Sequence, residues 1–207
     1  MLLKEYSIRQ IVNLIIHKIY TILTCRSARI IRYPLAVNGK KYIEWGKNIT
    51  MGRGCRLDVL RRVNMSPPVL KFGNDVQLND YVHICALDRV EIGDFTLIAS
   101  HVYISDNSHG CYKGSSQDSS PKIKPVDRHY PTTPVVIGEM VWIGEGTIVM
   151  PGISIGNGCV IGAHSIINKN IPDNCIAVGA PAKVIKRYNF ETAKWERTNS
   201  DGSFIEK

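Results

Sequence analysis

The chain has 207 residues, a formal charge of +8 and 44% hydrophobic residues, a composition that suits one substantial domain with a core of its own. The positive charge is concentrated near the N-terminus: residues 1–62 hold 13 Lys and Arg against three acidic residues, whereas residues 63–207 hold 13 against 15. Because the later part has no basic stripe with interleaved aromatic residues, the sequence argues against a nucleic-acid-binding protein.

The first predicted element is a helix near the N-terminus. Its aliphatic residues recur three or four positions apart, as on one helical face, at Ile8, Ile11, Val12, Ile15, Ile19, Ile22 and Leu23. Charged and polar residues interrupt the segment, so no apolar run reaches the roughly 18 residues of a membrane span. No cleavage site like that of a signal peptide follows it.

This helix has two interpretations. In the first, it covers the open end of the following domain or packs between subunits. In the second, its apolar face lies in an anionic membrane surface, with basic residues around it at Lys4, Lys18, Arg26, Arg29 and Arg32. The second interpretation places a cytoplasmic protein peripherally at the inner face of the cytoplasmic membrane.

A repeat of six residues runs through most of the remaining chain. Aliphatic residues lead an unbroken series of hexads at Ile137, Ile143, Val149, Ile155, Ile161 and Ile167. Small or β-branched residues hold the fifth positions, at Val141, Thr147, Ile153, Cys159, Ser165 and Ile171. The same frame occurs upstream, led by Phe72, Leu78, Ile92, Ile98 and Ile104, and more weakly by Ile43, Ile49 and Cys55. Eight residues instead of six separate Ile84 from Ile92, which predicts a two-residue insertion at one corner.

So short a period is typical of a parallel β-helix, in which each hexad forms one strand and one corner and three hexads form a coil. The first position then points inward, and the fifth shares the same narrow interior. Glycine recurs at the second position, as at Gly138 and Gly156, where a corner needs positive φ or close approach. Because Cys159 falls on an inward position, the six cysteines are expected to be free thiols in a reducing cytosol.

The repeat stops after Ile104 and resumes at Ile137. About thirty residues between them show no hexad pattern, and a loop of this length inside a compact domain is usually either functional or disordered. The hexad that begins at Ile104 ends at His109, so this histidine is expected at the edge of the rigid repeat. The histidines and cysteines do not have metal-ligand spacing, and no metal site is predicted.

Three segments together resemble the hexapeptide-repeat acyltransferases: ISDNSHG before the loop, the repeats after it, and GAPAKVIKR at their end. Within that family the chain looks like the maltose and galactoside acetyltransferases and the colanic acid and O-antigen O-acetyltransferases. The resemblance covers nearly the whole chain from about Arg29 onward. It implies an all-β fold, a left-handed parallel β-helix, which assembles as a homotrimer with acetyl-CoA bound between neighbouring subunits.

The resemblance also assigns roles to individual residues. His109 matches the catalytic histidine, whose neutral imidazole takes the proton of a sugar hydroxyl as its oxygen attacks the thioester. The substrate-binding position corresponds to Asn79, and His83 is a further candidate. The cofactor-binding positions correspond to Trp142, Gly144 and Ala163 for the pantetheine arm, and to Lys169, Lys183, Lys186 and Arg187 for the phosphates of CoA. Each residue also has a structural alternative: a satisfied loop histidine, a corner asparagine, a space-filling aromatic or a solvated charge.

The sequence thus predicts three parts. Residues 1–35 form a basic helical segment, residues 36–187 form the β-helix with an inserted loop at about 105–136, and residues 188–207 form a C-terminal extension. The extension is polar apart from Phe190, Trp195 and Phe204, and it has no repeat.

The predicted function is acetyl-CoA-dependent O-acetylation of a sugar hydroxyl in a bacterial surface polysaccharide, such as an O-antigen or capsule, or in its precursor. Two other functions remain open at this point: N-acetylation of an amino-sugar nucleotide or another small amine, and a non-catalytic β-helix scaffold. Cys111, two residues beyond His109, adds a rival mechanism in which the acetyl group passes through a thioester on the enzyme.

Overall fold

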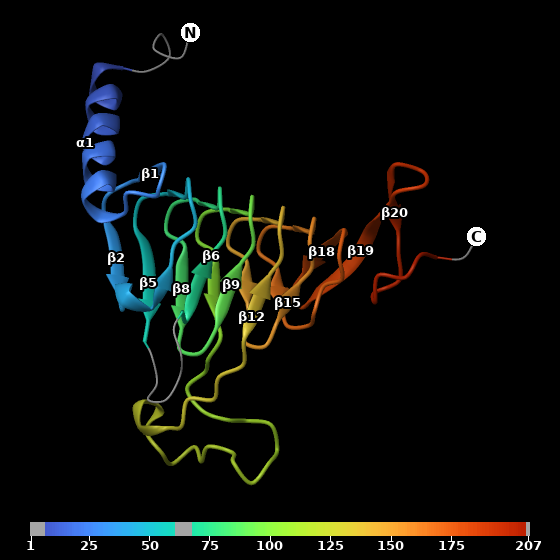
Figure 1. The fold of residues 1–207 in the computed structure, drawn as a ribbon. Helices are drawn as coiled ribbons and strands as arrows, with labels where there is room; N and C mark the ends of the chain where they lie inside the picture. The colour runs from blue at the N-terminus through green and yellow to red at the C-terminus, as the bar shows by residue number, and fades with distance from the viewer. Residues whose placement is uncertain (1–6, 61–67, 206–207) are drawn as a thin grey trace.

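Each hexad forms one short strand and one corner in the computed structural model of the chain, which describes residues 7–60 and 68–205 (Figure 1). The strands stack into three sheets that form the sides of a prism, and helix α1 (Ile8–Thr24) stands at its N-terminal end. The fold is the β-helix that the repeat predicts, and its three-sided parallel coils fit the left-handed form.

The three sheets are named A, B and C in the order in which the chain visits them. Sheet A contains β1 (Ile30–Ile31), β4 (Thr50–Met51), β7 (Gln77–Leu78), β10 (Leu97–Ile98), β13 (Trp142–Ile143), β16 (Val160–Ile161), β18 (Cys175–Gly179), β19 (Ala182–Asn189) and β20 (Lys194–Arg197). Sheet B contains β2 (Leu35–Asn38), β5 (Cys55–Val59), β8 (His83–Ala86), β11 (Tyr103–Ser105), β14 (Ile148–Val149) and β17 (Ile166–Ile167). Sheet C contains β3 (Ile43–Glu44), β6 (Leu70–Phe72), β9 (Val90–Ile92), β12 (Val135–Ile137) and β15 (Ser154–Ile155). The paired strands are parallel up to β18, after which β19 and β20 are antiparallel.

The first and fifth positions of the hexads fill the interior, as the sequence predicts. Ile143 and Cys159, for example, are fully buried. The polar fifth-position residues Thr147 and Ser165 are also buried, and each hydroxyl donates a hydrogen bond to the carbonyl oxygen of Gly162, at 3.2 and 2.7 Å. These inward hydroxyls are therefore satisfied within the coil, which explains why Thr and Ser alternate with aliphatic residues there.

The glycines at the second position serve close approach rather than positive φ. A Cβ atom at Gly144 would lie 2.5 Å from the backbone nitrogen of Ala163 in the next coil. Positive φ occurs two residues later, at the fourth position of the hexads, as at Met140, Gly146 and His164. The short distance between stacked coils therefore selects glycine at the second position.

The predicted two-residue insertion lies at the corner between sheets B and C, after β8. The carboxylate of Asp106 fills this wide corner and accepts hydrogen bonds from the backbone N–H groups of Leu87, Asp88 and Arg89 at 2.8 to 3.1 Å. Asp106 directly follows β11 and is fully buried. The chain leaves the prism there, earlier than the hexad pattern predicts, and Ser108 is exposed rather than inward.

Helix α1 turns its polar side toward the prism. A capping box between Ser7 and Gln10 begins the helix. The buried hydroxyl of Thr21 accepts a hydrogen bond from the N–H of Ile31 at 2.7 Å, which ties the helix to β1. Most aliphatic residues of the helix are exposed, namely Ile8, Val12, Ile15, Ile16, Ile19, Ile22 and Leu23, whereas Ile11 and Leu14 are half-buried. In a single chain this aliphatic face therefore does not cover the end of the prism. Among the described residues, α1 included, we find no helix with the length and apolar character needed to span a membrane.

Both ends of the β-helix extend beyond residues 36–187. At the N-terminal end, β1 already belongs to sheet A, because Ile30 pairs with Thr50 on β4. At the C-terminal end, β20 pairs with β19, and Trp195 packs edge-on against Tyr188 with ring centroids 5.4 Å apart. The C-terminal extension is thus folded onto the last strand of sheet A (Figure 1).

Candidate active site

A cavity of about 530 Å³ opens between the outer face of sheet B and the long loop. Strands β2, β5 and β8 supply most of one wall, and the loop supplies the other. The lining residues are Asn38, Arg56, Asp58, Leu60, Cys85, Leu87, Asn107, His109 and Tyr130. A concave site that combines apolar walls with a few convergent polar groups is typical of small-molecule binding.

The loop itself orients the imidazole of His109. The Nδ1 atom lies 3.4 Å from the carbonyl oxygen of Pro125 in the short 3₁₀ helix η3 (Pro125–Asp127), and the ring of Tyr130 packs against the imidazole with centroids 4.4 Å apart. Because a carbonyl oxygen can only accept a hydrogen bond, this contact places the proton of a neutral imidazole on Nδ1. The lone pair on Nε2 is then available to act as a base.

Further contacts hold the backbone of His109. The hydroxyl of Tyr112 donates to the carbonyl oxygen of His109 at 2.5 Å, and Nη1 of Arg128 donates to the Tyr112 hydroxyl at 2.7 Å. Both ends of the loop are thereby joined beside the histidine, because Arg128 comes from its later part. The loop extends from the prism (Figure 1) and folds back on itself beside the histidine.

A buried carboxylate, Asp58, lies beside His109 in the wall of the cavity. It accepts from Nε of Arg56 at 2.7 Å, and it binds Nδ2 of Asn38 at 2.7 Å and Nε2 of His83 at 3.0 Å. Burial alone would raise the pKa of Asp58, but the hydrogen bonds from Asn38 and His83 and the charge of Arg56 outweigh it. The pKa of Asp58 therefore lies below its ordinary value, and the cavity wall carries an ionised carboxylate.

Asp58 is not among the residues that the hexad pattern predicts for the site. The local signal for it is strand alternation on β5, where Cys55 and Leu57 point inward and Arg56 points outward. The register then places Arg56 beside His83 on β8. Charged residues at the outward positions of a repeat strand, next to the point where the repeat breaks, are the pattern that would have identified this carboxylate.

The two predicted substrate-binding residues lie at different distances from the cavity. His83 reaches its wall through the hydrogen bond to Asp58. Asn79 is exposed at the corner between sheets A and B, whereas the loop that carries His109 leaves from the corner between sheets B and C. A single chain therefore does not bring Asn79 and His109 together.

Three of the predicted cofactor-binding residues share the outer face of sheet A. The strand register aligns Trp142, Val160, Ile176 and Lys186 in one row across β13, β16, β18 and β19. Lys183 lies further along β19 and pairs with Val178, which is exposed. An exposed indole followed by two ammonium groups fits a molecule with an apolar arm and phosphate groups, as CoA has.

The other predicted cofactor-binding residues lie apart from this row. Gly144 and Ala163 stack on each other at the corner between sheets A and B, where the spacing of the coils already explains the glycine. Lys169 follows β17 in sheet B. Arg187 is next to Lys186 on β19 and therefore points to the opposite side of that strand. Of the predicted cofactor-binding residues, Trp142, Lys183 and Lys186 share one face of sheet A.

Cys111 is poorly placed for the rival thioester mechanism. Its side chain is buried, and its Sγ atom donates as a thiol toward Oδ1 of Asp118 at 3.7 Å. A thiol buried against a carboxylate lacks the positive neighbours that activate a nucleophilic cysteine. All six cysteines are free thiols. Within residues 7–60 and 68–205, no group of three or more His, Cys, Asp or Glu side chains could hold a metal ion.

Known proteins are similar to this chain in sequence over nearly its whole length. The family model described as bacterial transferase hexapeptide (six repeats) matches residues 134–169. A putative lipopolysaccharide biosynthesis O-acetyl transferase of Escherichia coli, WbbJ, is 44% identical over 196 residues, which cover 95% of this chain and 97% of that protein. The chain belongs to the bacterial hexapeptide transferase family.

Solved structures of other hexapeptide transferases are similar to it in fold. A maltose O-acetyltransferase from Clostridium difficile matches with a TM-score of 0.53 and 30% identity, covering 72% of this chain and 71% of that one. A mutant of AntD, an N-acyltransferase from Bacillus cereus in complex with dTDP and coenzyme A, matches with a TM-score of 0.64 and 22% identity, covering 79% and 83%. The sequence relatives are acetyltransferases, so this hexapeptide transferase is an acyltransferase rather than a non-catalytic scaffold.

Proposed function

We propose that the protein transfers the acetyl group of acetyl-CoA to a sugar hydroxyl of a bacterial surface polysaccharide or of its precursor. The observation that carries this proposal is the position of His109, which lines a cavity large enough for a sugar and whose Nδ1 contact with the Pro125 carbonyl leaves Nε2 free to accept a proton. The 44% identical relative is named as a putative lipopolysaccharide biosynthesis O-acetyl transferase, which supports the class of acceptor.

The geometry of His109 suits a general base. Acetyl-CoA supplies the acetyl group as a reactive thioester. Nε2 of His109 accepts the proton of the sugar hydroxyl while the hydroxyl oxygen bonds to the acetyl carbon, and the proton then passes to the sulfur of the departing CoA. Nδ1 keeps its own proton and its contact with the Pro125 carbonyl, which stabilises the charged imidazolium. The carboxylate of Asp58 is placed to accept hydrogen bonds from other hydroxyls of the acceptor.

Replacement of the histidine tests the proposal. His109→Ala is expected to lower turnover by about 10² to 10⁴-fold, the usual contribution of a general base. His129→Ala is the matched control, because His129 is an exposed histidine in the same loop. Acetyl transfer is followed by CoA release and product mass, with free sugars, nucleotide sugars, amino sugars and purified surface glycan as acceptors. Full turnover by His109→Ala would refute the mechanism, and transfer to amines alone would replace O-acetylation by N-acetylation.

The complete site, in our proposal, lies between two subunits of a homotrimer. Asn79 and His109 belong to different corners of the prism, so both contact the reacting sugar ring only if they come from neighbouring chains. Asn79→Ala and His109→Ala are each expected to be nearly inactive alone. Co-expressed, they should regain activity, because random mixing leaves about a quarter of the shared sites with both residues intact. Mixed trimers that remain inactive would contradict a shared site.

The exposed aliphatic face of α1 supports a further element of the proposal, contact with an anionic membrane that carries a lipid-linked acceptor. Of the flanking basic residues, Arg29 pairs with Asp75 at 2.9 Å and Lys18 donates to the carbonyl oxygen of Arg29 at 2.8 Å, while Lys4 lies outside the described residues. Ile15→Glu places a charge on the exposed face without entering the core. The wild-type protein should sediment with anionic vesicles at low salt and Ile15→Glu should not. Wild-type protein that stays in solution would rule out the membrane and assign the face to a neighbouring subunit.

A further inference from the structure

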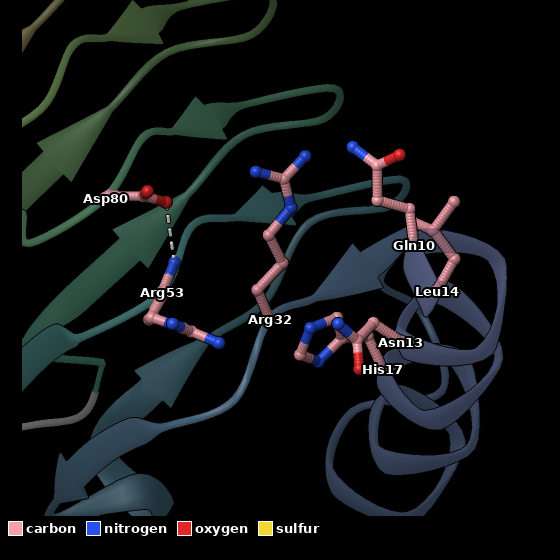
Figure 2. A pocket seen from close by; sticks show the side chains of 7 residues that line it. All are labelled: Gln10, Asn13, Leu14, His17, Arg32, Arg53 and Asp80. Carbon is pink, nitrogen blue, oxygen red and sulfur yellow. Dashed lines mark hydrogen bonds between the residues drawn. The ribbon is translucent and has the colours of Figure 1, made fainter. Parts of the chain in front are cut away.

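A second cavity, of about 310 Å³, lies between α1 and the corner that joins sheets A and B (Figure 2). It is separate from the cavity around His109 and shares no lining residue with it. Its walls come from the polar side of the helix and from three successive coils, and the lining residues are Gln10, Asn13, Leu14, His17, Arg32, Arg53 and Asp80. The helix thus presents amides and an imidazole to the prism where an aliphatic face would be expected.

The cavity has more positive than negative charge. Arg32 and Arg53 extend from neighbouring coils toward α1 (Figure 2), and within the described residues neither guanidinium forms an ion pair. The single acid, Asp80, uses its Oδ1 atom to accept from the backbone N–H of Arg53 at 2.8 Å. Two guanidinium groups therefore face the cavity with one carboxylate, which is already bound to the backbone.

His17 adds a directed donor to these charges. Its Nδ1 atom accepts from the backbone N–H of Tyr33 at 3.1 Å, so Nε2 carries the proton of the neutral ring and is free to donate. Burial lowers the pKa of His17, and the positive charges of Arg53 and Arg32 lower it further. The lowered pKa of His17 thus reflects the excess of positive charge in the cavity.

We propose that this cavity binds the phosphate or diphosphate group through which the acceptor sugar is attached to its carrier. Guanidinium groups present paired N–H donors that match the oxygens of phosphate. A diphosphate that joins a sugar to its carrier has two negative charges, which balance both arginines, whereas a single carboxylate has one. The identity of the carrier rests on the proposed function, but the binding of phosphate does not.

The position of the cavity relative to His109 supports this assignment. Arg53 lies just before β5, and Asp58, in the wall of the first cavity, lies on that strand. Five residues of extended chain span at most about 16 Å, so Arg53 and Asp58 are within reach of one glycosyl diphosphate. A sugar near Asp58 and a diphosphate near Arg53 would then be held together across sheet B.

Calorimetric titration of the full-length protein with inorganic pyrophosphate tests the proposal, with saturating CoA present so that phosphate sites for CoA are filled. Arg53→Gln and Arg32→Gln are each expected to weaken binding by about tenfold or more, because each removes a charge-assisted pair of hydrogen bonds. Arg9→Gln is the matched control: it removes the same charge from an exposed position on α1 outside the cavity, and should leave binding unchanged. A second readout is the pKa of His17, which should rise when the anion binds, as measured by NMR.

Two acceptors are compared in the transfer assay to identify the carrier. One is a soluble nucleoside diphosphate sugar, and the other is a polyprenyl diphosphate sugar in phosphatidylcholine vesicles. Arg53→Gln should raise KM for the true carrier about tenfold, with kcat and the KM for acetyl-CoA unchanged. Pyrophosphate binding that is absent, or equal in Arg53→Gln, Arg32→Gln and wild type, would overturn the proposal even if acetyl transfer is intact. Binding that responds to both substitutions in a protein without transferase activity would keep this site and reject the proposed function instead.

Discussion

The carboxylate of Asp106, at the start of the long loop, holds the wide corner after β8, and its loss should destabilise the fold. Asp106→Ala leaves the backbone N–H groups of Leu87, Asp88 and Arg89 without their acceptor. An unsatisfied buried donor costs about 1 to 3 kcal/mol. Because Leu87 and Asp88 are only partly buried and Arg89 is exposed, water can reach some of the donors, and we take the lower end for each. The free energy of unfolding is then expected to fall by about 3 kcal/mol.

The assay is urea unfolding followed by circular dichroism, with Asp118→Ala as the matched control. Asp118 also accepts hydrogen bonds from three backbone N–H groups, those of residues 113 to 115. It is exposed, however, so water can replace its carboxylate and only a small change is expected. Asp106→Asn keeps one acceptor oxygen and should lie between wild type and Asp106→Ala. Equal losses for Asp106→Ala and Asp118→Ala would refute the reasoning, as would no loss for Asp106→Ala.

Three other predictions concern acid stability, thiol reactivity and cofactor binding. The pKa of Asp58 lies below its ordinary value of 3.8, so its ionised form stabilises the protein above about pH 4 and this stabilisation is lost as the pH falls through the lowered pKa. Asp58→Asn should therefore flatten the acid side of the stability profile, and an unchanged profile would count against an ionised Asp58. Burial raises the pKa of Cys55 and of Cys159 to about 11. Neither thiol should therefore react with iodoacetamide in the native protein at pH 7.5, as measured by peptide mass spectrometry. Labelling of either thiol would contradict its burial. Lys186→Gln should raise KM for acetyl-CoA several-fold, whereas Arg187→Gln, on the other side of the strand, should change KM little. A larger increase in KM for Arg187→Gln than for Lys186→Gln would contradict binding of the CoA phosphates on the Lys186 side of β19.

Much of the prism could be predicted because the hexad period constrains every coil in the same way. An inward position accepts only a side chain of a certain volume, and this is why Cys159 and Thr147 were both identifiable as interior residues although one is a thiol and the other a hydroxyl. The same logic located the insertion before Ile92. It could not show that Ser108 leaves the interior, because the chain departs at Asp106, whose side chain binds a corner 17 to 19 residues earlier.

The periodicity of the sequence could not predict the orientation of α1 or the role of Asp58, for different reasons. A helical stripe of aliphatic residues is normally the buried face, but here the side chains of Gln10, Asn13 and His17 face the prism instead. Periodicity alone cannot show whether the apolar stripe packs against the same chain or against something outside it. Asp58 gains its role from His83, which lies 25 positions later in the chain and meets it only through the strand register.

The insertion that interrupts the repeat also makes the candidate site. In the later coils, β14 and β17 have two residues each and offer one outward side chain before the corner. In the earlier coils, β5 and β8 are five and four residues long, so sheet B continues past the level of a regular corner and gains a second outward position, occupied by Asp58 and Cys85. This extra strip of sheet forms the wall against which the loop places His109. A coil with a strict period of six has no such wall, so the candidate cavity lies at the coils in which the period fails.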